Sequence, residues 1–140
     1  MLGNIKILIV DDAPPMRAFI KAGILSSISK DIFIDEAVSG EAAQSKLQLH
    51  NYDLILCDWN MPGMKGSDLL RWMKEQEDLK DTPFIMVTAH NEKDIIMDAV
   101  NLGITDFIVK PITVDMLAKK TASALRDIIL KKRQNNNGEE

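Results

Sequence analysis

The sequence predicts an α/β fold in which helices cover both faces of a parallel β-sheet. Five short runs rich in isoleucine, valine and leucine alternate with longer segments whose apolar residues recur at helical spacing. Several runs are apolar at successive positions, which is typical of strands buried on both faces of a parallel sheet. Because strand and helix alternate five times, we expect right-handed crossovers and a three-layer sandwich. The length of 140 residues indicates a single domain.

Each strand and each helix can be placed in order along the chain. The predicted strands are the apolar runs at 5–10, 32–38, 54–57, 84–87 and 107–109. The helical stripes between and after them consist of Met16, Phe19, Ile20, Gly23, Ile24 and Ile28, then Ala43 and Leu47, then Leu69, Leu70 and Met73, then Ile95, Ala99 and Leu102, and finally Leu117, Thr121, Ala124 and Ile128. Helix breakers precede the first three helices at Pro14-Pro15, Ser39-Gly40 and Met61-Pro62-Gly63, and Gly103 ends the fourth.

Composition narrows the class of protein. The chain carries 21 acidic and 17 basic side chains, for a net charge of −4, which argues against a nucleic-acid-binding surface. Hydrophobic residues make up 46% of the chain, enough for a core, yet no apolar run approaches the ~20 residues of a membrane span. The one cysteine, Cys57, excludes an internal disulfide and suits a reducing compartment. We therefore expect a cytoplasmic protein that neither inserts into membranes nor binds nucleic acid directly.

The C-terminal residues differ in character from the rest. Lys131, Lys132 and Arg133 would complement the C-terminal end of a helix, so we place the folded domain at 1–133. Residues 134–140 are polar, and we expect them to form a disordered, solvated tail. The alternative is that they begin a linker to a further domain.

Polar side chains follow four of the predicted strands at the point where each strand ends. Asp11 and Asp12 follow the first strand, Asp58 the third, Thr88 the fourth and Lys110 the fifth. The carboxyl ends of parallel strands meet at one edge of the sheet, which is where open α/β sheets bind their ligands. A single aspartate there would be an ordinary helix N-cap, but four strands that end in complementary chemistry indicate a site.

Three carboxylates in one pocket need a counter-charge. Two of them about 5 Å apart repel by roughly 3 kcal/mol at an effective dielectric constant near 20. Either one acid is protonated or a cation lies among them. Oxygen ligands favour a hard divalent ion such as Mg²⁺, which commonly shares its coordination sphere with a phosphoryl group. An aspartate can itself accept that phosphoryl group, while a lysine and a threonine hydroxyl hold its oxygens.

These residues resemble the receiver domain of two-component response regulators. The resemblance extends from about residue 5 to about residue 129, and the combination of motifs is highly specific. The segments DWNMPG at 58–63, VTA at 87–89 and FIVKP at 107–111 are most similar to single-domain chemotaxis regulators. The resemblance implies a flavodoxin-like, doubly wound (βα)5 fold with the strand order 2-1-3-4-5, which the residues alone do not reveal.

The resemblance also implies a role for each site residue. Asp58 is the phosphoacceptor. Mg²⁺, with Mn²⁺ as a possible substitute, is bound by Asp12, Asp58 and the carbonyl of Asn60, and by Asp11 through a water molecule. Thr88 and Lys110 hold the phosphoryl oxygens, and Ala89 leaves room for them. Phe107 is the switch residue that moves with Thr88. The peptide bond before Pro111 is cis.

Three features depart from the pattern of the chemotaxis regulators. Phe107 stands where a tyrosine is usual, so it has no hydroxyl to donate a hydrogen bond in the active state. Pro14 and Pro15 follow the acid pair and stiffen the loop after the first strand. His90 lies two residues beyond Thr88, at a position that tunes phosphate loss in this family. We expect these changes to affect the lifetime of the signal and the choice of target, not the chemistry.

By this resemblance the partners are a histidine kinase and a downstream protein such as the flagellar motor switch. The target would bind the face formed by the fourth helix, fifth strand and fifth helix. The chain would be a signalling phosphoacceptor, not an enzyme that turns over an external substrate. The alternative to a stand-alone regulator is a receiver domain excised from a larger regulator with an enzymatic or DNA-binding output. Two more remote alternatives remain. An aspartate-based phosphohydrolase typically has an acidic residue at the position of Asn60. A flavodoxin-like nucleotide-binding module typically has a phosphate-binding loop at the position of Pro14 and Pro15.

Overall fold

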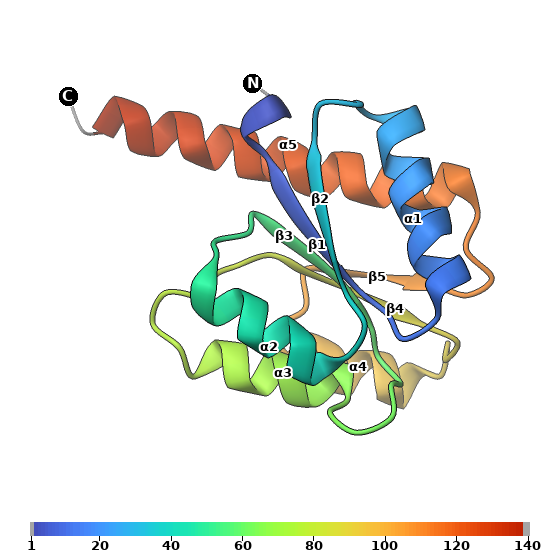
Figure 1. The fold of residues 1–140 in the computed structure, drawn as a ribbon. Coiled ribbons are helices and arrows are strands. Elements are labelled where there is room, and N and C mark those ends of the chain that lie inside the picture. The colour runs from blue at the N-terminus through green and yellow to red at the C-terminus, as the bar shows by residue number, and fades with distance from the viewer. Residues whose placement is uncertain (1, 139–140) are drawn as a thin grey trace.

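A five-stranded parallel sheet lies at the centre of the computed structural model, which describes residues 2–138, with side chains to residue 135 (Figure 1). The strands are β1 (Lys6–Val10), β2 (Phe33–Ala37), β3 (Leu54–Asp58), β4 (Phe84–Thr88) and β5 (Asp106–Val109). Their order, β2-β1-β3-β4-β5, confirms the doubly wound topology that the resemblance implies. Each predicted apolar run coincides with one strand to within one or two residues.

Helices cover both faces of this sheet, as Figure 1 shows. The helices are α1 (Pro14–Ser27), α2 (Gly40–Leu49), α3 (Gly66–Lys74), α4 (Lys93–Leu102) and α5 (Val114–Gly138), and a short 3-10 helix, η1 (Leu2–Asn4), precedes β1. Side chains from α1 and α5 pack on one face and those from α2, α3 and α4 on the other. The predicted three-layer arrangement is therefore confirmed.

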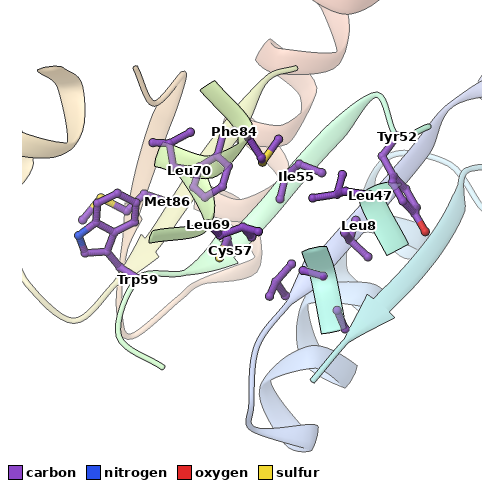
Figure 2. Packing of buried hydrophobic residues seen from close by; sticks show 14 of the residues in the cluster. Leu8, Leu47, Tyr52, Ile55, Cys57, Trp59, Leu69, Leu70, Phe84 and Met86 are labelled. Carbon is purple, nitrogen blue, oxygen red and sulfur yellow. The ribbon is translucent and has the colours of Figure 1, made fainter. Parts of the chain in front are cut away.

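Alternate residues of each central strand enter the two apolar layers. In β1, Ile7 and Ile9 face α1 and α5, whereas Leu8 and Val10 face the layer that Figure 2 shows, where Trp59 and Phe84 also pack. Every residue of β3 and of β4 is buried. This explains why their sequences are apolar at successive positions.

The edge strand β2 differs from the buried strand that its apolar run suggests. Only Ala37 is fully buried, and Phe33 keeps 55% of its surface exposed. β2 pairs with β1 alone and lies at the edge of the sheet, so its outer side has no neighbouring strand. The acidic residues Asp35 and Glu36 fit this position, because charges at an edge strand oppose further strand pairing.

The helix boundaries follow local signals. Pro14 and Pro15 occupy the first turn of α1, where a missing N–H costs nothing. The hydroxyl of Ser39 caps α2 by accepting a hydrogen bond from the Ala42 N–H at 3.0 Å. Gly103 ends α4 in the left-handed conformation with φ of 103°, as the sequence predicts.

Helix α5 is longer than the sequence suggests. It continues to Gly138, so residues 134–138 are helical where we expected a disordered tail; residues 139–140 lie outside the described residues. No proline interrupts the segment, and a helix already anchored by its buried face extends at little cost until a glycine. Near the C-terminal end of α5, the Lys132 Nζ forms an ion pair with the Asp53 Oδ1 at 2.9 Å.

The helices differ in how firmly they are attached. α3 buries Gly66, Leu69, Leu70 and Met73, whereas the one fully buried residue of α4 is Ala99. Within the described residues, no helix is long and apolar enough to span a membrane.

Candidate functional site

The polar residues predicted at the strand ends come together at one edge of the sheet. Carboxylate oxygens of Asp11, Asp12 and Asp58 lie within 4.8 Å of one another. The Lys110 Nζ, which follows β5, lies 3.4 Å from the Asp58 Oδ2. Thr88 ends β4, the strand that neighbours β3, and its carbonyl accepts a hydrogen bond from the Lys110 N–H at 2.7 Å. Three carboxylates and an ammonium therefore lie together, and Thr88 ends the strand beside the one that carries Asp58.

Asp58 is held rigidly because it is the last residue of a fully buried strand. Its side chain is only 7% exposed, and its Oδ1 accepts a hydrogen bond from the Asn60 N–H at 3.2 Å. The backbone of Asp58 is also closely packed against Gly66, because a Cβ on Gly66 would lie 2.6 Å from the Asp58 carbonyl oxygen. The Asp58 Oδ2 faces Lys110, so it is the oxygen that an incoming electrophile would meet beside a cation.

Every polar group of Asp11 except Oδ2 forms a hydrogen bond within the described structure. Its N–H donates to the Ala37 carbonyl, its Oδ1 accepts from the Ala13 N–H, and its carbonyl accepts from Arg17. Its Oδ2 is buried and has no hydrogen-bond partner among the described residues. Burial raises the pKa of Asp11 above 3.8, repulsion from Asp58 and Asp12 adds to that effect, and the Ala13 N–H and Lys110 oppose it.

The site suits a hard divalent cation. Asp12 is exposed and can turn toward an ion, whereas the Asp11 Oδ2 is an orphaned buried acceptor that a cation or its hydration water would satisfy. All the side-chain donors are oxygens, as Mg²⁺ prefers. Asn60, whose carbonyl the resemblance implies as a further ligand, lies two residues after Asp58 and is exposed.

Thr88 and its neighbours lie at the end of β4, beside the strand that carries Asp58. The Thr88 side chain is fully buried, and its Oγ1 accepts a hydrogen bond from the His90 N–H at 3.0 Å, which leaves the hydroxyl proton free to be donated elsewhere. Ala89 is exposed and small. The peptide bond between Lys110 and Pro111 is cis, as the resemblance implies.

Phe107 has a partner that the sequence did not reveal. This residue of β5 is half-buried and packs against the layer under α2, α3 and α4. The Lys120 Nζ lies 5.1 Å from the centroid of its ring and 2.8 Å from the Asp106 Oδ1. Lys120 is thus held by both a carboxylate and an aromatic face.

Sequence reasoning also missed Arg17. Its Nη1 donates a hydrogen bond to the Asp11 carbonyl at 2.7 Å, so it contacts the main chain of the acid pair. One arginine in an amphipathic helix is unremarkable by pattern, and no spacing in the sequence singles it out.

Three other polar or reactive residues stay outside the cluster. Cys57 is fully buried, and burial raises the pKa of its thiol well above 9.0, in keeping with an inert core residue. The His90 Nδ1 faces the Glu92 Oε2 at 3.3 Å. Trp72, a residue of α3, is half-buried and packs against the edge of the core.

Comparison with known proteins shows similarity to chemotaxis proteins. The chain is 42% identical to the chemotaxis protein CheY of Pseudomonas aeruginosa over 118 residues, which cover 82% of this chain and 91% of that protein. It is 38% identical to the chemotaxis protein CheY-3 of Vibrio cholerae over 120 residues, which cover 84% of this chain and 88% of that protein.

Solved structures show the same fold. CheY4 of Vibrio cholerae matches with a TM-score of 0.78 at 27% identity, covering 86% of this chain and 98% of that one. The receiver domain of a putative LuxO repressor protein from Vibrio parahaemolyticus matches with a TM-score of 0.81 at 28% identity, covering 91% and 94% of the two chains. The family profile described as the response regulator receiver domain matches residues 7–122. The chain belongs to the response regulator receiver family.

Proposed function

We propose that this chain is a phosphorylation-activated receiver that accepts a phosphoryl group from a histidine kinase on Asp58. The observation that carries the proposal is the placement of Asp58. It is a buried, oriented carboxylate that lies within 4.8 Å of two further carboxylates and 3.4 Å from an ammonium group. A carboxylate so placed has both a site for a charge-neutralising cation and a fixed cation for the transferred group.

In the proposed reaction, an oxygen of Asp58 attacks the phosphorus of a phosphohistidine. The new oxygen–phosphorus bond forms as the phosphorus–nitrogen bond breaks, and the imidazole nitrogen keeps the electron pair and takes up a proton. The Asp58 Oδ2 is the favoured nucleophile, because Oδ1 is engaged by the Asn60 N–H. Lys110 would hold one phosphoryl oxygen and the Thr88 hydroxyl another, while Ala89 leaves room for them.

Bound Mg²⁺ (or Mn²⁺) would neutralise charge on the phosphoryl oxygens. Asp12, Asp58 and the Asn60 carbonyl would hold the ion directly, and the Asp11 Oδ2 would accept a hydrogen bond from one of its waters. The unpaired state of that buried oxygen supports this assignment. Burial of the Thr88 side chain would strengthen the contact of its hydroxyl with a phosphoryl oxygen.

The signal would pass through Thr88 and Phe107 to the face formed by α4, β5 and α5. Phosphorylation would bias an existing equilibrium between two arrangements of these residues, and a partner protein would bind one of them. The relatives named chemotaxis proteins are covered over 91% and 88% of their length, which favours a stand-alone, chemotaxis-type regulator acting in the cytoplasm. A target such as the flagellar motor switch fits that role, and the chain would signal by binding, without turnover of an external substrate.

The test is phosphorylation by acetyl phosphate with Mg²⁺, followed by intact mass measurement. One added phosphoryl group is expected, and none with EDTA. Asp58→Asn should abolish the added mass, whereas Asp127→Asn, a change at an exposed aspartate of α5, should leave it intact. Equal labelling of Asp58→Asn and the wild type would show that the acceptor is another residue.

A second possibility is a receiver that belongs to a larger regulator. Its support is the likeness to receiver domains of longer proteins, such as the putative LuxO repressor, and the extension of α5 to Gly138. The complete reading frame of the gene distinguishes the two, because only this possibility requires an output domain after the receiver.

A further inference from the structure

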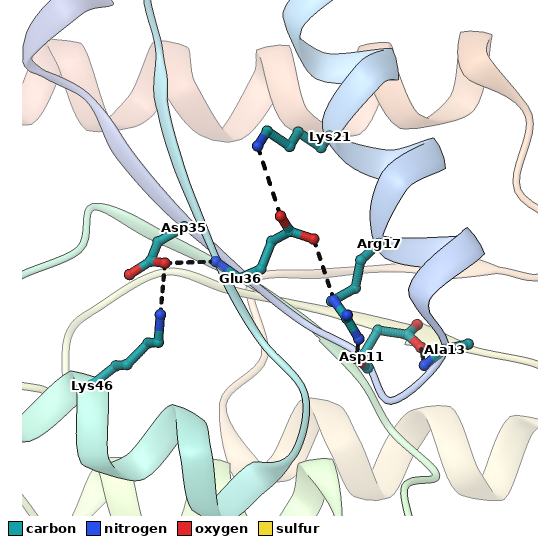
Figure 3. A network of polar contacts seen from close by, with 7 residues as sticks. All are labelled: Asp11, Ala13, Arg17, Lys21, Asp35, Glu36 and Lys46. Carbon is teal, nitrogen blue, oxygen red and sulfur yellow. Dashed lines mark hydrogen bonds and ion pairs between the residues drawn. The ribbon is translucent and has the colours of Figure 1, made fainter.

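Arg17 links three elements around the acid pair, as Figure 3 shows. It lies in the first turns of α1, and its side chain is only 13% exposed. Its Nη1 donates to the Asp11 carbonyl at 2.7 Å, and its Nε donates to the Glu36 Oε1 on β2 at 3.2 Å. The planar guanidinium therefore bridges the loop after β1 and the edge strand with two hydrogen bonds of fixed relative direction.

We propose that Arg17 is a positioning residue for Mg²⁺ binding, which it supports by fixing the main chain between Asp11 and Asp12. This inference rests on the proposed function, because it concerns the ion that phosphotransfer would use. Arg17 does not contact the carboxylates of the cluster through any hydrogen bond in the described structure; its contact is with the Asp11 carbonyl.

The geometry explains how a contact on a carbonyl would control two side chains. The Asp11 carbonyl belongs to the planar peptide unit that also contains the Asp12 nitrogen. Holding that oxygen restrains the plane, and with it the position of the Asp12 Cα from which the side chain extends. The Asp11 N–H and Oδ1 are already held by Ala37 and Ala13, so Arg17 completes the set that leaves only Oδ2 open.

Glu36 keeps Arg17 in place from the other side. The register pairs Glu36 with Ile9 on β1, two residues before Asp11, so the carboxylate lies alongside the loop that Arg17 grips. Lys21, one helical turn beyond Arg17, approaches the same carboxylate through Oε2 at 3.7 Å and does not contact Asp11. Lys21 is therefore a matched control: it shares the helix, the charge and the partner of Arg17, but not its contact with the acid pair.

Charge alone predicts the opposite effect from positioning. A cation near an acidic cluster repels Mg²⁺, so its removal should tighten metal binding if only the charge matters. If the guanidinium positions the ligands, its removal should weaken binding, because groups that orient metal ligands typically change affinity by about 10- to 100-fold. Arg17→Lys separates the two, since it keeps the charge and loses the forked geometry.

The experiment is a Mg²⁺ titration followed by the fluorescence of Trp59, which is buried next to Asp58, in a Trp72→Phe background. Arg17→Ala should raise the apparent Kd of Mg²⁺ about tenfold, Arg17→Lys should raise it by a smaller factor, and Lys21→Ala should leave it unchanged. The rate of labelling by acetyl phosphate at saturating Mg²⁺ should stay within about twofold of the parent, because the acceptor itself is intact. Melting in EDTA identifies any variant that is not folded.

The outcomes separate this inference from the proposed function. If the parent protein gains no phosphoryl group on Asp58, the proposed function fails, whatever Arg17 does. If the parent is labelled but Arg17→Ala binds Mg²⁺ as tightly as the parent or more tightly, the positioning role is overturned. Should Arg17→Ala not fold, Arg17→Lys decides: weaker Mg²⁺ binding supports the role, and an unchanged Kd refutes it.

Discussion

The substitution Asp11→Asn tests whether the acid cluster opposes folding when no cation is bound. The Asp11 Oδ2 is buried without a partner, and its carboxylate lies within 4.8 Å of those of Asp12 and Asp58. An asparagine that keeps its oxygen on the Ala13 N–H places a neutral, donating amide nitrogen in the pocket where the charged Oδ2 stood. We therefore expect the apo protein to become more stable, although a residue of the proposed site has been changed.

The size of the effect follows from the distances. Two unit charges 4.8 Å apart at an effective dielectric constant of 20 repel by about 3.5 kcal/mol. The repulsion from buried Asp58 is relieved in full, that from exposed Asp12 is reduced by solvent, and the lost attraction to Lys110 acts in the opposite direction. A net gain of about 2 kcal/mol corresponds to a rise in Tm of about 7 °C for 140 residues.

The effect must depend on pH with a definite sign. Burial raises the pKa of folded Asp11 above its ordinary value of 3.8, so the folded state binds this proton more tightly than the unfolded state does. The wild type therefore loses stability as the pH rises from 3.8 through the folded pKa, and the loss is complete above it. Asparagine does not titrate, so its advantage should be full at neutral pH and should vanish below about pH 3.8.

Thermal melts in EDTA and across a Mg²⁺ series provide the assay. The wild type should gain stability as Mg²⁺ is added, the variant should gain much less, and the gap should narrow or reverse. Asp127→Asn, at an exposed site, should stay within about 0.5 kcal/mol of the wild type. An Asp11→Asn protein that is less stable than the wild type in EDTA at neutral pH, or equally responsive to Mg²⁺, would refute the reasoning.

Three further predictions concern other parts of the site. Lys110→Met removes the ammonium 3.4 Å from the Asp58 Oδ2 and should slow labelling by acetyl phosphate about 100-fold without weakening Mg²⁺ binding, as measured by mass and by fluorescence titration. Gly66→Ala would place a Cβ 2.6 Å from the Asp58 carbonyl oxygen and should cost about 1–3 kcal/mol in denaturant unfolding, whereas Gly3→Ala, whose nearest contact is at 4.0 Å, should be neutral. Because burial raises the pKa of Cys57, its thiol should not react with a thiol reagent at pH 8 until the chain unfolds, and rapid reaction of the native protein would contradict its burial.

The sequence predicts the parts of the fold that depend on local pattern. Runs of buried residues identify β3 and β4, and polar residues at the strand ends point to a shared edge because parallel strands end together. Ser39 and Gly103 mark helix ends through their own chemistry. The strand order required the family resemblance, since alternating strands and helices are compatible with more than one order.

Other features depend on neighbours that are distant in the chain. The Arg17 bridge exists because β2 pairs with β1 in the register that places Glu36 opposite Ile9, and no local pattern encodes that register. The contact of Lys120 with Phe107 likewise requires α5 to pass over β5. The exposure of Phe33 follows from the edge position of β2, which an apolar run does not reveal.

α4 has fewer fully buried residues than α3, and this difference affects where the fold opens most readily. Moving a helix away from the sheet costs free energy in proportion to the apolar surface that it uncovers. Leu69, Leu70 and Met73 of α3 are fully buried, whereas α4 has Ala99 fully buried and Ile95, Ile96 and Leu102 only partly buried. Asp58, the proposed acceptor, ends β3, whereas α4 follows β4, which ends at Thr88. We therefore expect local opening of this fold to involve α4 before α3.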